Sequence, residues 1–68
     1  MRVLKFLINA GANLLVEKLI DYMIDAGHEV YINAASNVES LKNKYTHNFR
    51  LVNLFDFDLR KIDYIFNL

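Results

Sequence analysis

The chain has 68 residues, eight of them basic and eight acidic, with no cysteine and no proline. We expect one domain spanning residues 1–68, and the absence of cysteine excludes disulfides and thiolate metal sites. The balanced charge offers no footprint for nucleic acid or an anionic membrane, so neither is an expected partner. The N-terminal apolar stretch, broken at Lys5 and Asn9, is too short to span a membrane and lacks a signal-peptide cleavage pattern. These features favour a cytoplasmic location.

The first half of the chain predicts a strand, a helix and a second strand. Residues 3–8 are nearly all apolar, as in a strand buried on both faces of a parallel sheet. Residues 13–26 carry an apolar stripe at helical spacing, with Asn13 placed to cap the helix and Gly27 placed to end it. Residues 29–33 predict the second strand. The stripe consists of Leu15, Val16, Leu19, Ile20 and Met23.

The second half predicts a short helix and two further strands. Residues 34–37 are expected to form a loop, in which Ser36 or Asn37 would cap a helix over 38–44. Residues 49–54 and 62–68 have the composition of a third and a fourth strand. Strands that alternate with helices favour a parallel sheet with right-handed crossovers.

Four segments of this pattern carry a family resemblance. They are LINAGANLLVEKLIDYMIDAGHEVYIN at 7–33 and, further along, SNVESL, NFRLVN and IDYIFNL. Together they resemble the first quarter of the extended short-chain dehydrogenase/reductase family, the NAD-dependent nucleotide-sugar epimerases and dehydratases, with the UDP-glucuronate decarboxylases most similar. The resemblance implies an α/β fold: a truncated, partial Rossmann-type three-layer unit. Its parallel sheet of about four strands would have the order 3-2-1-4, with two helices mainly on one face.

The same resemblance implies NAD as a cofactor and marks the positions that would contact it. The family's G-x-x-G-x-x-G turn falls on Ala10, Asn13 and Val16, so all three motif glycines are replaced. Asn33 stands where the family has an acidic residue for the ribose, and Asp56 matches the family's adenine-contacting aspartate. The implied cofactor-binding positions are Ala10, Gly11, Asn13, Leu14, Leu15, Asn33 and Asp56.

The replaced glycines predict weak or absent NAD binding. The motif glycines permit the tight turn, the approach of the pyrophosphate to the backbone and close packing of helix on strand. Asn13 tolerates positive φ, but its side chain would extend towards the phosphate oxygens, and Val16 adds bulk between helix and sheet. The helix N-terminus keeps its partial positive charge, while Glu17 in the first turn would repel a pyrophosphate.

No residue pattern predicts catalysis or a metal site. The family's catalytic Y-x-x-x-K pair is missing, because no tyrosine has a lysine four residues later. The histidines His28 and His47 lack ligand spacing, and His28 matches a structural position of the family. Asp56, Asp58 and Asp63 are expected in a solvated loop and at a strand entrance. Five aromatic side chains are expected in the core rather than on a base-stacking surface: Phe49, Phe55, Phe57, Tyr64 and Phe66.

The strand order also implies an uncovered surface. Residues 55–61 would have to cross two strands to reach the fourth, so we expect a taut link without a helix. The sheet face opposite the helices would then be bare and apolar. Three hypotheses follow. The chain is a catalytically inactive remnant with little NAD affinity, or an interaction module that docks this face on itself as a homo-oligomer or on a full-length relative, or a nucleotide-binding half-site that works only within a complex.

Overall fold

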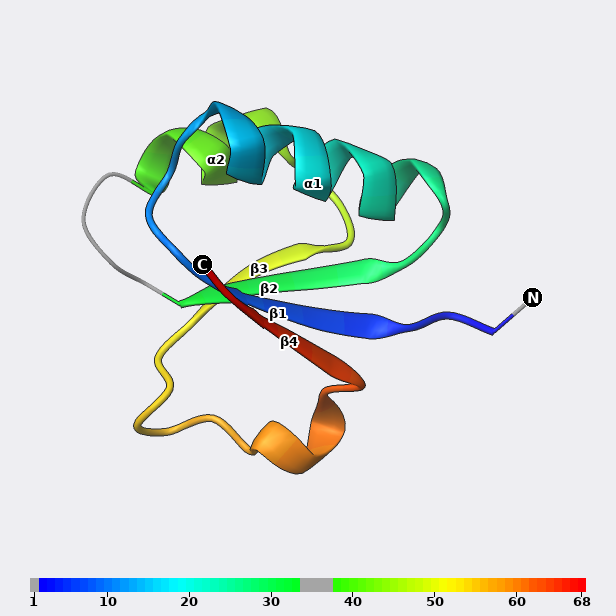
Figure 1. Cartoon of the computed structure of the whole chain (residues 1–68), viewed down its shortest axis with the longest axis vertical. Coiled ribbons are helices and arrows are strands. Elements are labelled where there is room, and N and C mark those ends of the chain that lie inside the picture. Colours follow the sequence, from blue (N-terminus) through cyan, green and yellow to red (C-terminus); the bar gives the residue numbers. More distant parts are fainter. Residues whose placement is uncertain (1, 34–37) are drawn as a thin grey trace.

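The computed structural model describes residues 2–33 and 38–68, which form a four-stranded parallel sheet with two helices on one face (Figure 1). The strand order is β3-β2-β1-β4, so the predicted α/β fold, parallel pairing and strand order are confirmed. The predicted loop at 34–37, with Ser36 or Asn37 as a cap, lies outside the described residues. The elements are β1 (Lys5–Asn9), α1 (Leu14–Asp25), β2 (Glu29–Asn33), α2 (Glu39–Lys44), β3 (Phe49–Val52), the 3₁₀ helix η1 (Leu59–Lys61) and β4 (Tyr64–Asn67).

Helix α1 begins and ends where the sequence predicts. The Asn13 side-chain oxygen accepts a hydrogen bond from the N–H of Val16 at 3.0 Å, which satisfies one donor of the first turn. At the other end Gly27 has φ 86, in the left-handed region that favours glycine. The N–H of His28 then reaches the carbonyl of Met23, closing the terminal turn.

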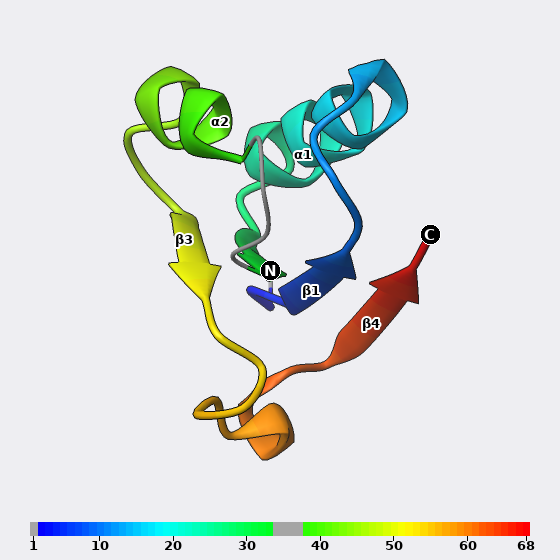
Figure 2. The same ribbon diagram turned by 90° about the vertical axis from the view of Figure 1, so that its left-hand side faces the viewer.

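The core lies between the helices and one face of the sheet (Figure 2). Side chains alternate across a strand, so Ile8 of β1 and Ile32 of β2 point towards the helices, and both are fully buried. From α1, Val16, Ile20 and Met23 fill the space above them. Leu15 is 65% exposed, so the prediction that it belongs to the buried stripe is wrong. It lies about 100° from Val16 around the helix, off the centre of the buried face.

The link between β3 and β4 differs from the prediction. It contains the single turn η1, in which the N–H of Arg60 donates to the side chain of Asp58. A helix fits because β3 ends at Val52 and β4 starts only at Tyr64, so the connection runs from 53 to 63 and is longer than assumed. It hangs below the sheet instead of running straight across it (Figures 1 and 2).

The face opposite the helices is therefore not bare. Leu7 points away from the helix-side core, between Phe6 and Ile8, yet it is only 1% exposed. The ring of Tyr31 lies 5.4 Å from that of Phe57 in the link. Polar residues share this face, among them Asn9 and Asn33 at the strand ends. The link covers the middle of the face, so the expectation of an open apolar face is wrong.

The aromatic residues divide into two groups. Phe49 and Phe66 pack against the core, as predicted. Phe55 is 98% exposed and Tyr64 is 57% exposed, so the expectation that these two are core residues is wrong. Phe55 sits in a turn of the link, and Tyr64 sits on an edge strand, so neither has neighbours on all sides.

Candidate functional site

Five of the predicted cofactor positions come together where β1 turns into α1. Ala10 packs against the core, and Gly11 is exposed, with nothing within 4 Å of the position that a Cβ would take. Leu14 and Leu15 start the helix with their side chains 69% and 65% exposed. Solvent therefore reaches the place where the family resemblance puts a pyrophosphate.

The β1–α1 turn is held by contacts within the chain that involve Asn13 and Val16. Asn13 has extended backbone angles, φ −157 and ψ 174, so it does not use the positive φ that a glycine would permit. Its side-chain oxygen accepts a hydrogen bond from the N–H of Val16, and its amide nitrogen lies 3.5 Å from the carbonyl oxygen of Gly11. Val16 itself is fully buried in the core. A phosphate at this turn would have to displace the cap that the chain already supplies.

Three asparagines form a row across the carboxyl edge of the sheet. The amide of Asn9 donates to the side-chain oxygen of Asn67 at 2.9 Å, and the amide of Asn33 approaches the oxygen of Asn9 at 3.5 Å. The N–H of Leu54 is 3.4 Å from the oxygen of Asn33. Asn33, expected at a ribose, is thus engaged within the protein.

The sequence reasoning missed Asn9 and Asn67, although a signal was present. Each of the three asparagines is the last residue of a parallel strand, and the order 3-2-1-4 makes those strands neighbours. Carboxyl ends of adjacent parallel strands lie at one edge, where α/β proteins place ligands. In this chain the amides at that edge bind each other.

Asp56 does not join this edge. It lies exposed in a turn after β3, where its own N–H donates to the carbonyl of Asn53. No hydrogen bond or salt bridge connects it to the β1–α1 turn within residues 2–33 and 38–68. The match to an adenine-contacting aspartate therefore brings Asp56 to no other predicted site residue.

The other two aspartates have separate structural roles. Asp58 caps η1 and pairs with Arg60, a hydrogen bond that lowers the pKa of the Asp58 carboxyl. Asp63 binds the Arg2 guanidinium at 2.9 Å and the N–H of Lys5 at 2.8 Å. They lie in the link and at the entrance to β4, as predicted. Across the described residues, no three His, Asp or Glu side chains gather as metal ligands would.

His28 makes structural contacts at the start of β1. Its Nδ1 accepts a hydrogen bond from the N–H of Leu4 at 3.0 Å. Its ring meets Phe6 edge-on at 5.4 Å between centroids. The imidazole thus ties the entrance of β1 to the end of α1.

Polar contacts join α1 to the end of α2. The hydroxyl of Tyr45, just after α2, donates to the Asp21 carboxylate and lies 3.1 Å from the carbonyl of Glu17. Burial, followed by the hydrogen bond to Asp21, raises the pKa of Tyr45 to about 12. Lys44 binds Glu17 at 3.1 Å, which raises the pKa of the Lys44 ammonium.

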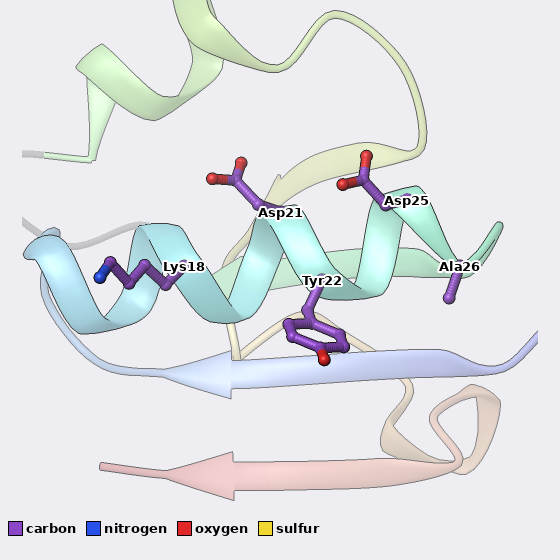
Figure 3. Close-up of a pocket in the computed structure, with 5 residues that line it drawn as sticks. All are labelled: Lys18, Asp21, Tyr22, Asp25 and Ala26. Atoms are coloured by element: carbon purple, nitrogen blue, oxygen red, sulfur yellow. The ribbon is translucent and has the colours of Figure 1, made fainter.

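Two surface hollows lie away from the β1–α1 turn. One runs along the outer side of α1, where Asp21 and Asp25 point to one side and Tyr22 to the other (Figure 3). Its lining comes from a single helix, so no second element closes it. The other lies beside β2 and β3, with Glu29 and Arg50 among its residues. Neither hollow includes a predicted cofactor position.

Apolar side chains are exposed along β4. Tyr64 is 57% exposed, Ile65 53% and Leu68, directly after the strand, 61%, while Phe66 is half-buried. We call these four residues the β4 surface. They occupy both faces of an edge strand, and no charged residue lies among 64–68.

Comparison with known proteins adds no identity: no family model, no curated protein and no solved structure matches the chain. None of the helices in the described part of the chain combines the length and the apolar character needed to cross a membrane.

Proposed function

We propose that this chain is a non-catalytic interaction module built on a partial Rossmann-type unit, with little or no affinity for NAD. The observation that carries the proposal is the β4 surface, where Tyr64, Ile65 and Leu68 leave apolar side chains in solvent on an edge strand. Exposed apolar groups on a strand with free backbone donors and acceptors are suited to binding another chain.

The β1–α1 turn supports the second half of the proposal. Asn13 fills the capping position, and Val16 fills the gap between helix and sheet. A bound pyrophosphate would therefore have to displace the Asn13 cap at a turn where the resembled family uses glycine. Asn33 offers an amide, already engaged with Asn9, in place of the acidic residue that the family uses.

Calorimetric titration with NAD⁺ and NADH tests the absence of cofactor binding. We expect no binding heat at ligand concentrations up to about 1 mM, which corresponds to less than about 4 kcal/mol of binding free energy. A dissociation constant in the micromolar range would refute this half of the proposal.

Fluorescence of the apolar dye anilinonaphthalene sulfonate tests the interaction surface. The wild-type chain at about 1 µM should enhance the dye signal, and a Tyr64→Lys/Ile65→Lys variant should reduce the enhancement. Lys18→Ala, which changes the outer side of α1, serves as the matched control. Equal dye binding by all three proteins would count against the β4 surface.

The half-site hypothesis makes the opposite prediction for the turn. If the chain were a nucleotide site waiting for a partner, glycine at Ala10, Asn13 and Val16 would strengthen pyrophosphate binding. We expect no gain, because the same changes remove the α1 cap and leave a cavity at a fully buried side chain. Calorimetric titration of the triple variant and of Ala10→Gly alone with NAD⁺ decides between the half-site hypothesis and the proposal. Circular dichroism checks that both variants fold.

A further inference from the structure

The two edge strands present different residues to an incoming strand. In a parallel pair, backbone groups of alternate residues point towards the neighbouring strand, and those of the residues between point away. At β3, the N–H of Val30 donates to the carbonyl of Asn48, and Val30 is aligned with Phe49. The backbone groups of Phe49 and Leu51 therefore point to the open edge.

The same reasoning identifies the open groups of β4. Asn9 of β1 is aligned with Asn67, and its carbonyl accepts from the N–H of Leu68. Residues 64, 66 and 68 thus turn their backbone groups towards β1. Ile65 and Asn67 turn theirs to the open edge, where no strand of the described chain pairs with them.

We propose that β4 pairs in antiparallel fashion with β4 of a second copy of this chain, which extends the sheet across both copies. The proposal rests on the interaction-module function and names its partner. A twofold axis through the pair joins Ile65 of each copy with Asn67 of the other, and each of these pairs exchanges both backbone hydrogen bonds. Phe66 then faces Phe66 in the closer, non-hydrogen-bonded position, with about 4.5 Å between Cα atoms.

Charge selects β4 over β3 for this pairing. The equivalent twofold pairing of β3 would place Arg50 directly opposite a second Arg50, and like charges in that position destabilise a strand pair. In β4 the corresponding residue is Phe66, and an aromatic pair is favourable there. Neither lysine nor proline interrupts 64–68, so β4 lacks the residues that usually protect an edge.

The area available indicates a weak dimer. Only one edge strand is buried, with Tyr64 57%, Ile65 53% and Leu68 61% exposed beforehand. That surface falls short of the roughly 800 Å² per partner of a standard interface. We therefore expect a dissociation constant on the order of 10–100 µM.

Sedimentation equilibrium from about 1 µM to about 500 µM tests the association. The wild-type chain should pass from monomer to dimer, and Ile65→Lys should weaken the dimer by about tenfold or more, because its ammonium would be desolvated at the interface. The matched control is Tyr22→Lys on α1, a separate element, where the side chain is 81% exposed. Its dimer constant should stay unchanged. A wild-type chain that remains monomeric throughout overturns the proposal.

Cysteine cross-linking tests the register, and the natural chain has no cysteine to interfere. Phe66→Cys should form a disulfide-linked dimer rapidly, because the two thiols would face each other across the axis. Asn67→Cys should cross-link slowly, because its counterpart is Ile65 of the other copy. Equal rates for the two variants overturn the twofold arrangement. If Phe66→Cys fails to fold, the effect of Ile65→Lys on sedimentation decides the matter.

These outcomes are separable from those of the proposed function. Dye binding that depends on Tyr64 and Ile65, in a chain that never dimerises, keeps the β4 surface as an interaction site and overturns the second copy as its partner. NAD binding refutes the first proposal without affecting the sedimentation result.

Discussion

The two edges of the sheet, β3 and β4, differ in how completely other parts of the chain cover them. On the side of β2 and β3, α2 packs through Leu41, which is 2% exposed, and Tyr45 stacks near Phe49 with ring centroids 5.3 Å apart. On the side of β4, Tyr64 and Ile65 remain more than half exposed. Both edges belong to one sheet of short strands, so strand composition alone does not explain the contrast.

The difference indicates that packing of helices and side chains, more than strand pairing, determines which edge strand stays exposed to solvent. Tyr45 and Lys44 connect α2 to α1 through Asp21 and Glu17, and this fixes the second helix over β3. Within residues 2–33 and 38–68, the helices pack mainly on β2 and β3 rather than on β4. Arg50 adds a charge to the covered edge, whereas β4 has none.

The largest effect on stability is expected from truncating the buried side chain through which α2 packs on the sheet. Leu41→Ala should lower the free energy of unfolding by about 3 kcal/mol, because it removes a buried side chain and leaves a cavity. The matched change Ile65→Ala in β4 should cost less than about 1 kcal/mol, since that side chain is 53% exposed. Urea unfolding followed by circular dichroism measures both, at protein concentrations of about 1 µM, below dimerisation. Similar losses from the two variants would contradict the contrast.

A second substitution, at Tyr45, tests how the stability of the covered edge depends on pH. Tyr45→Phe removes the hydroxyl that binds Asp21 and should cost about 1 kcal/mol at neutral pH. Because burial raises the pKa of Tyr45 from 10.0 to about 12, the folded state favours the neutral phenol. This stabilisation is complete below pH 10 and is lost as the pH rises to 12.

Urea unfolding of both proteins between pH 8 and pH 12 provides the measurement. The difference in free energy of unfolding between wild type and Tyr45→Phe should narrow as the pH rises from 10 to 12. A gap that stays constant would show that the Tyr45 pKa is the same in the folded and unfolded chains.

The smallest effect is expected at the open side. Asn67→Ala removes the oxygen that accepts from Asn9 at 2.9 Å and should cost about 0.5 kcal/mol, because the pair is exposed to water that can replace it. Asn33→Ala should cost more, since it lies half-buried and binds both Asn9 and the N–H of Leu54. The reverse order would mean that β4 is held more firmly than its exposure indicates.

Much of the fold was readable from local pattern. The period of the apolar residues, the Asn13 cap and the Gly27 stop located α1 to within a residue, and the alternation of strands and helices predicted the parallel sheet. The errors fell where burial depends on distant neighbours. Leu15 and Tyr64 are apolar at suitable spacing, but both stay more than half exposed, although the Tyr64 ring stacks on Phe6 of β1.

The sequence by itself determined the order of the elements, the parallel sheet and the absence of glycine at positions 10, 13 and 16, because each depends on residues close together in the chain. Only the tertiary structure decided that Leu7 is buried on the face away from the helices and that Asn9, Asn33 and Asn67 meet at one edge. It also decided that the apolar residues Tyr64 and Ile65 of β4 stay exposed at an edge of the sheet. These outcomes depend on which strands become neighbours, and side-chain burial and hydrogen bonding follow from that long-range arrangement.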